Sequence, residues 1–247
     1  MTGLTAPGDR NSAAKDAKKR CMRLLAVLLA VPTIALAQDD YTLLGLGVRS
    51  LPEYDGSSKQ ELELIPVVRY YGRTLFARTT QGTLEGGARW EVARGLHAGV
   101  QLAYVGGNDR TDVDPGAALG VHLEWDTAVG PAPVNVLLRA GKHLDSDLGA
   151  QTDLRGTVGV YGSHGLRVGL YAQGTWATDD WVRSYYTAGD GGLLYTAYGV
   201  EGTYDVSRHW VVLASTHLRR LHGDAASSPI TEEKTNYYLS IGLAYRF

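Results

Sequence analysis

The 247-residue chain has little cysteine, phenylalanine or proline, and it has no long apolar run. Its one cysteine, Cys21, excludes a framework of internal disulfides. No apolar stretch reaches the roughly 18 residues of a membrane-spanning helix. Positive charge is not in excess, with 24 Lys and Arg against 26 Asp and Glu, and no basic patch indicates nucleic-acid binding. By contrast, 31 glycines and 15 tyrosines favour many strands over helices.

The longest apolar segment lies near the N-terminus. Residues 1–20 are polar and basic, and residues 24–36 are almost wholly apolar. This segment is too short to cross a bilayer as a helix, which needs roughly 20 residues. The small-x-small ending before Ala37 predicts a secretory signal that is cut between Ala37 and Gln38. Met22 is an alternative start of the chain, because Met22 and Arg23 form a minimal signal head.

The predicted organisation is an N-terminal extension and signal peptide, residues 1–37, followed by one domain, residues 38–247. The length of the second part fits a single domain. It carries no cysteine and has a net charge of −6, from 18 basic and 24 acidic residues.

Twelve candidate strands follow, most of them close to the 9–11 residues that a tilted membrane strand needs. The third is the shortest. They are 41–50, 62–71, 75–80, 83–92, 96–105, 117–126, 134–142, 153–163, 166–176, 194–205, 210–221 and 236–247.

Side chains alternate within these strands between an apolar face and a small or polar face. In 117–126, for example, Leu119, Val121 and Leu123 oppose His122 and Glu124. A soluble sandwich also alternates, but here the polar face carries charge deep within the strands. In a membrane barrel such charges line a polar lumen. The predicted lumen-lining charges are Glu85, Arg89, Glu124, Arg139, Arg155, Arg167, Glu201 and Arg219.

Connection lengths alternate between long and short, with residues 81–82 as the one exception on the long side. Long external loops and short periplasmic turns are typical of outer-membrane barrels. In that topology, aromatic residues gather near the two rims, as expected for an aromatic girdle. These residues are Trp90, Trp125, Tyr204, Trp210 and Tyr245 at the short turns, and Tyr104, Trp176 and Tyr237 at the long loops.

The last twelve residues form the clearest strand of the chain. Their apolar face ends on Phe247, with a second aromatic two residues earlier. This ending resembles the C-terminal signal of bacterial outer-membrane barrels. The residues of this predicted assembly signal are Leu239, Ile241, Leu243, Tyr245 and Phe247.

The sequence therefore predicts an all-β fold, a transmembrane antiparallel up-and-down barrel of about twelve strands, with ten as the alternative. The predicted location is the bacterial outer membrane. The expected partners are outer-membrane lipid, lipopolysaccharide and the barrel-assembly machinery.

Two stretches resemble a known family. One runs from Leu44 through Pro52-Glu53-Tyr54-Asp55-Gly56 to Arg73, and the other from Arg220 through Gly223-Asp224-Ala225 and Ser228-Pro229 to the C-terminal end. Together they resemble the MipA/OmpV family, the MltA-interacting protein group of outer-membrane proteins. Residues 179–186 resemble a family loop, but Tyr185-Tyr186-Thr187-Ala188 departs from the usual Tyr-Phe-Gly-Val.

The resemblance implies a scaffold that joins a murein hydrolase to a murein synthase. Other family members are treated as adhesins or as porin-like proteins. The alternatives to a scaffold are therefore a small channel or uptake pore and, third, a surface lipid hydrolase.

The two family-like loops also have plain structural interpretations. The segment Pro52–Gly56 reads as a turn, because proline fixes φ and Asp-Gly closes a tight bend. Residues 223–229 read as a short helix over the barrel mouth, with Asp224 as its N-terminal cap. An outer loop with Asp109, Asp112 and Asp114 lacks the spacing of a calcium loop. We expect no metal site and no cofactor.

Catalysis is not expected. Ser215 and His217 share a face, but the alternation puts that face inside, away from lipid substrate. The lumenal charges leave two alternatives open, a conducting pore or a lumen blocked by paired side chains. Because barrels of roughly 16 or more strands hold open channels, twelve strands favour the blocked lumen.

Overall fold

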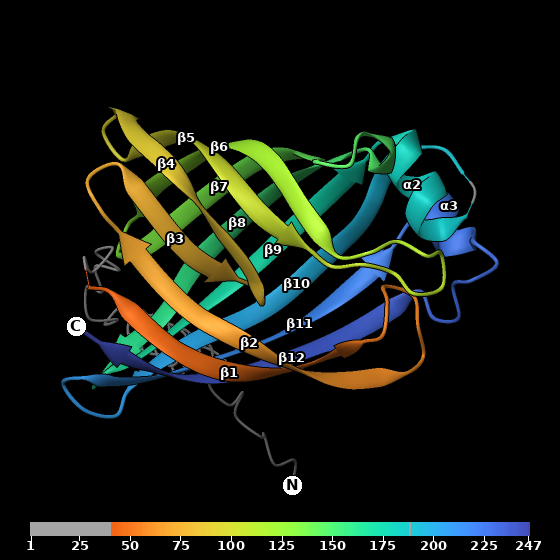
Figure 1. Ribbon diagram of the computed structural model, residues 1–247. Coiled ribbons are helices and arrows are strands. Elements are labelled where there is room, and N and C mark those ends of the chain that lie inside the picture. The colour runs from red at the N-terminus through yellow and green to blue at the C-terminus, as the bar shows by residue number, and fades with distance from the viewer. Residues whose placement is uncertain (1–40, 188) are drawn as a thin grey trace, which may run out of the picture. The chain divides into compact units, whose positions relative to one another are not determined.

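A computed structural model describes residues 41–187 and 189–247, in which twelve antiparallel strands close into one barrel (Figure 1). Each strand pairs with its neighbours in the chain, and β1 pairs with β12 from Leu43–Arg246 to Ser50–Leu239. The predicted fold is confirmed, with twelve strands rather than ten. The strands are β1 (Leu43–Pro52), β2 (Gln60–Tyr71), β3 (Leu75–Thr80), β4 (Thr83–Ala93), β5 (Leu96–Val105), β6 (Gly116–Val129), β7 (Ala132–His143), β8 (Ala150–Ser163), β9 (Leu166–Ala177), β10 (Gly192–Asp205), β11 (Trp210–Leu221) and β12 (Thr235–Arg246).

The alternation in the sequence becomes an outer and an inner wall. On β6, Leu119 and Val121 are 56% and 57% exposed, whereas His122 and Glu124 are 3% and 4% exposed. An apolar exterior with a polar interior is the arrangement of a barrel that faces lipid. None of the described helices is long and apolar enough to cross a membrane. The proposed signal, including Ala37 and Gln38, lies outside the described residues.

Strand ends differ from the predicted bounds by up to three residues. The clearest case is β6, which continues to Val129 instead of ending at Asp126. Residues 127–129 of β6 pair with β7 as far as Val129–Ala132, so backbone hydrogen bonds extend the hairpin beyond the predicted strand end. The end of β12 differs by one residue, at Arg246 instead of Phe247, although the Phe247 N–H still donates to the Thr42 carbonyl.

The hairpin β3–β4 interrupts the wall. Strand β3 has six residues, and only its first part pairs with β2, over Tyr71–Phe76, Tyr70–Ala77 and Arg69–Arg78. Beyond that point the Thr79 side chain, not the backbone of β3, bonds to β2. Its Oγ1 accepts from Val68 N and donates to the Pro66 carbonyl.

The tip of this hairpin lies inside the barrel. Arg49 projects inward from β1, and its Nη1 donates to the Gln81 carbonyl at 2.6 Å. Since β2 lies between β1 and β3, this contact requires the turn to cross the inner face of β2. Gly82 fits there because a Cβ atom would lie 2.2 Å from the Arg49 guanidinium. Residues 60–68 of β2 consequently have no strand partner on that side.

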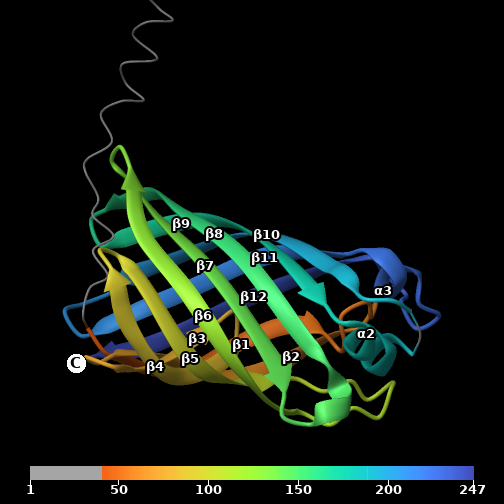
Figure 2. The ribbon, with the colours of Figure 1, turned by 90° about the horizontal axis from the view of Figure 1, so that it is seen from above.

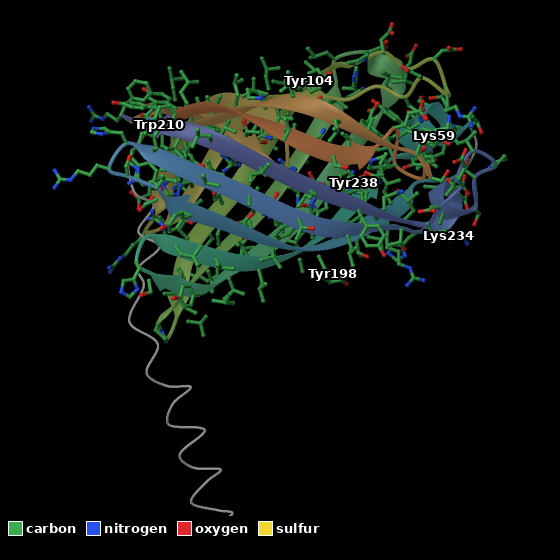
Figure 3. The ribbon with its side chains drawn as sticks, turned by 90° about the horizontal axis from the view of Figure 1, so that it is seen from below. Lys59, Tyr104, Tyr198, Trp210, Lys234 and Tyr238 are labelled. Carbon is green, nitrogen blue, oxygen red and sulfur yellow. The ribbon has the colours of Figure 1, made fainter. Side chains whose placement is uncertain are left out.

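The two ends of the barrel differ. Short turns close one end, at residues 72–74, 94–95, 130–131, 164–165 and 206–209. The other end carries the loops 53–59, 106–115, 144–149, 178–191 and 222–234, which contain η1 (Ser146–Leu148), α2 (Asp179–Tyr186) and α3 (Gly223–Ser227). Figure 2 shows α2 and α3 together at this end. In Figure 3, Lys59 and Lys234 mark the loop end, and Trp210 marks the turn end.

The loops pack into a cap, whose core is a cluster of buried aromatic and aliphatic side chains. Trp181 and Tyr185 of α2 stack with ring centroids 4.2 Å apart, and Val182 and Tyr186 are buried beside them. Ala225 and Ala226 of α3 join the same cluster. The main apolar core of this barrel therefore lies over the loop-end mouth.

Candidate functional site

The lumen contains an ion-pair network centred on Glu85, which is 1% exposed. Its carboxylate accepts from Arg78 Nε at 2.5 Å and from Arg139 Nη1 at 2.9 Å. Thr80 Oγ1 and Gln101 Nε2 donate to it at 2.8 and 3.2 Å. Four donors on one carboxylate satisfy the acceptor capacity of a buried charge.

The same two arginines extend the network along the inner wall to β6 and β8. Arg78 Nη1 also donates to Glu124 at 2.9 Å, and Arg139 Nε donates to Asp153 at 2.6 Å. Arg89 lies 3.7 Å from Glu124. The network therefore joins the consecutive strands β3 to β8 on the lumen side of the wall.

Four further ion pairs lie elsewhere in the lumen. Arg155 donates to Glu201 at 2.5 Å. Arg219 donates to Asp55 at 2.6 Å, while Arg167 and Arg246 both contact Asp205. All eight charges that the sequence places in the lumen thus lie on the inner wall with at least one ion-pair partner.

Sequence reasoning missed several of the partners. Arg78, Asp153, Asp205 and Arg246 lie on the inward face of their strands, so the same alternation could have found them. Asp55 gave no such signal, because it comes from a loop that folds back over the mouth.

Aromatic rings surround the charges and fill more of the bore. The Arg155 guanidinium lies 3.9 Å from the ring centroid of Tyr171, and Arg219 lies 4.2 and 4.6 Å from those of Tyr195 and Tyr238. These distances are within the range of cation–π attraction. Arg155 and Arg219 are thus each held by an ion pair and by aromatic rings.

The first family-like loop folds into the cap. Tyr54 is buried, and its hydroxyl donates to the Ile230 carbonyl at 2.8 Å. Gly56, with φ of 107°, donates its N–H to Asn236 Oδ1 at 2.7 Å. Asp55 accepts hydrogen bonds from Arg219 and from the Tyr238 hydroxyl. Pro52 ends β1, and Glu53 lies 3.9 Å from Lys59.

The second family-like loop contains the expected short helix, α3, which ends at Ser227. The prediction for Asp224 was wrong, because His222 occupies the N-cap position and Asp224 instead accepts from the Asp190 N–H at 2.8 Å. Gly223 adopts a φ of 55° at the start of α3, and Ala225 is buried in the cap core. Ser228, which precedes Pro229, donates to the Tyr186 carbonyl at 2.6 Å.

Further contacts tie the loops to one another at the surface. Glu232 accepts from Ser58 and lies 3.3 Å from Arg110, and hydrogen bonding from Ser58 is the main reason that its pKa is lowered. Asn108 Nδ2 donates to the Tyr185 carbonyl at 2.8 Å. The pKa of Tyr185 rises to about 12 because burial disfavours its charged form. The two family-like loops therefore pack together as parts of one lid over the loop-end mouth.

The residues of the predicted assembly signal lie on the outer wall. Leu239, Ile241 and Leu243 are exposed toward the lipid side. Tyr245 packs at the turn end against Trp210 and Phe247, with centroid separations of 5.4 and 5.0 Å. Such a cluster is typical of an aromatic girdle.

Ser215 and His217, which share the inner face of β11, each have another neighbour. Ser215 hydrogen-bonds to Ser240 at 2.8 Å, while His217 stacks on Tyr238. No three His, Cys, Asp or Glu side chains of this part of the chain gather where they could hold a metal ion.

A cavity of about 410 Å³ remains in the lumen below the cap. It lies toward the short turns, because Tyr41, Arg69, Asp126 and Arg167 line it from that end. The tip of the β3–β4 hairpin lines its other side at Gln81.

Comparison with solved structures identifies similar barrels. NanC porin matches with a TM-score of 0.54 and 12% identity, over 83% of this chain and 100% of that one. A bacterial polysaccharide outer membrane secretin has a TM-score of 0.45 and 13% identity, covering 84% and 99%. OmpT of Vibrio cholerae has a TM-score of 0.43 and 10% identity, covering 84% and 96%. The likeness to NanC porin supports the fold alone.

Among curated proteins no match is found. A family model described as "MltA-interacting protein MipA", however, matches residues 44–247, which is nearly all of the described barrel. The chain is thus an outer-membrane barrel protein, and it belongs to the MipA family.

Proposed function

We propose that this protein is a non-enzymatic anchor that holds cell-envelope partners at the periplasmic face of the outer membrane. The observation that carries the proposal is closure of the barrel. The lid covers the loop-end mouth, and the ion-paired side chains of the Glu85 network project into the lumen from β3, β4 and β7. A barrel closed in this way is poorly suited to passing solutes. Its short turns and the rim beside them are then the surfaces that remain for binding partners.

The short turns offer a charged surface for such contacts. Arg73, Arg94 and Arg208 are exposed, and each lies in a different turn. An acidic protein surface would complement them electrostatically. The family name points to MltA, a murein hydrolase, and a murein synthase is the second expected partner. Since turns of two to four residues offer far less than the roughly 800 Å² of a standard interface, the contact is weak or multivalent.

Secretion is part of the proposal. Cleavage between Ala37 and Gln38 would deliver residues 38–247 to the assembly machinery, and outer-membrane lipid and lipopolysaccharide would surround the barrel. N-terminal sequencing of the protein from outer membranes should return Gln38.

Site-specific photocrosslinking tests the anchor directly. A photoreactive amino acid at Arg94 or Arg208 should give crosslinks to a murein hydrolase or synthase in intact envelopes. The same group at Ser227, on the lid, serves as the matched control and should give none. Equal yields from both ends, or none from the turns, would contradict the proposal.

The cavity favours one alternative function. A small channel would require the cavity to open through the lid to the loop end of the barrel. Ion conduction across a bilayer would reveal such an opening. The third candidate, a lipid hydrolase, has no support from Ser215 and His217, whose partners are Ser240 and Tyr238.

A further inference from the structure

Strand β2 has a free edge over its first half. Its neighbour β3 has six residues and pairs only with Arg69–Tyr71, because the tip of the β3–β4 hairpin turns into the lumen. The preceding residues of β2 pair with β1 on one side and with no strand of the described chain on the other. An outward turn of the hairpin would not close this gap, since β3 ends at Thr80 and its register with β2 places that residue opposite Val67. A free strand edge is a template for pairing with another chain.

The hydrogen bonds of Thr79 show which backbone groups point to the free edge. Its Oγ1 accepts from the Val68 N–H and donates to the Pro66 carbonyl, so the even-numbered residues of β2 direct their backbone groups away from β1. The even-numbered residues of Gln60–Leu64 therefore each present one N–H and one carbonyl to the open side. Within the described residues these groups have no hydrogen-bond partner. Pro66, which lacks an N–H, then marks the end of the edge that a partner strand can use.

The outer side of this edge is apolar and uncovered. Leu62 and Leu64 are 81% and 75% exposed, the highest values for large apolar residues in the described part of the chain. Lipid can cover their side chains, but it offers no hydrogen bonds to the backbone groups beside them. A ligand that suits the edge must therefore supply both apolar side chains and a hydrogen-bonding backbone, as an extended polypeptide does.

The inner side of the same edge is acidic. Glu61 and Glu63 alternate with the two leucines, and Glu61 is exposed at the loop end of β2. The carboxylates of Glu53, Glu63 and Asp109 lie close enough to Glu61 to repel its charge. Arg49 is the cation that acts on Glu61, but it already pairs with Glu63 at 2.7 Å. Glu61 and Asp109 have no ion pair within the described residues, so this side of the edge favours a basic ligand.

We infer that the free edge of β2 binds an extended peptide segment in which basic and apolar residues alternate, and which reaches the edge from the loop end. In an antiparallel pair, residues directly opposite each other share one face of the sheet. The apolar side chains of the peptide therefore lie beside Leu62 and Leu64 on the outer wall, and a lysine or arginine lies opposite Glu61. The inference does not depend on the anchor function, because the edge begins at the loop end and the anchor surface lies on the turns.

Fluorescence anisotropy of labelled peptides on the full barrel in lipid nanodiscs, with empty nanodiscs as the reference, tests the edge. The probe is a short peptide of alternating leucine and lysine. Methylation of its leucine nitrogens removes the N–H groups that would face β2, whereas methylation of its lysine nitrogens removes those that point away. We expect the leucine-methylated peptide to bind about tenfold more weakly or worse, because several hydrogen bonds are lost, and the lysine-methylated peptide to keep its affinity. Equal binding of the two methylated peptides, or no binding of the unmodified one, would overturn the inference.

Two variants and a crosslink locate the peptide. Glu61→Gln removes the unpaired charge at the edge and should weaken binding about two- to fivefold, the range of an exposed ion pair. Glu233→Gln changes another exposed carboxylate, in the loop 222–234, and as the matched control it should leave the affinity unchanged. A photoreactive group on the central leucine of the peptide should label Gln60–Pro66. Labelling confined to other strands, or equal effects of the two variants, would contradict the inference.

Discussion

Replacement of Glu85 by alanine tests whether the lumenal network is a fixed, buried structure. The change removes one acceptor shared by Arg78, Arg139, Thr80 and Gln101. Breaking a buried ion pair costs roughly 3–5 kcal/mol. Arg78 keeps Glu124, and Arg139 keeps Asp153, so part of the charge stays compensated. We therefore expect a loss of about 3 kcal/mol in the free energy of unfolding, at the lower end of that range.

Glu63→Ala on strand β2 is the matched control. Glu63 also faces the lumen, but it has one partner, Arg49 at 2.7 Å, and its side chain is 41% exposed. Its loss should cost about 1 kcal/mol or less. Urea unfolding in lipid vesicles, followed by tryptophan fluorescence, measures both. Similar small losses for the two variants would show that water screens the Glu85 network and would refute the argument.

Three further predictions concern the wall, the chain end and the lid. Leu170→Arg on the outer wall of β9 should cost about 2–4 kcal/mol in lipid, and Gln173→Arg on its inner wall much less; equal costs would show that the faces are wrongly placed. Deletion of Phe247 should reduce outer-membrane yield and heat-modifiable mobility, and unchanged values would argue against an assembly signal. Because hydrogen bonds from Ser58 lower the pKa of Glu232, the contact between Ser58 and Glu232 is complete above the ordinary pKa of 4.5 and weakens as pH falls through the lowered pKa. Proteolysis of residues 53–59 should therefore be faster at about pH 3 than at pH 7, and a Glu232→Gln variant should lose most of that difference.

The barrel itself could be predicted because period-two alternation determines both fold and orientation. Once Leu119 and Val121 face lipid, His122 and Glu124 must face the lumen. The same rule placed Glu85, Arg139 and Arg219 inside. The two-residue turn at 81–82 also places Arg78 opposite Glu85 in the β3–β4 hairpin. The rule could not show that Glu85 binds Arg139 as well, because β7 is not adjacent to β4.

The packing of the lid and the inward position of the β3–β4 tip could not be predicted from the alternation of side chains. The contact between Tyr54 and Ile230 joins loops 176 residues apart, and no local signal specifies it. The inward tip of β3–β4 was likewise hidden, since Gln81–Gly82 reads only as a tight turn. The N-cap residue of α3 was predicted to be Asp224, but the helix starts at Gly223 and His222 is its N-cap residue. Asp224 instead accepts a hydrogen bond from Asp190 in the neighbouring loop.

Planar-bilayer conductance of the purified wild-type barrel tests the closed lumen most directly. Heat-modifiable mobility of the same sample would establish that the barrel is folded. With the lid over the mouth and the ion-paired side chains of Glu85, Arg155 and Arg219 projecting into the lumen, we predict no steady open channel. Steady nanosiemens-scale channels, recorded without crosslinks from Arg94 or Arg208, would contradict the anchor and establish a pore.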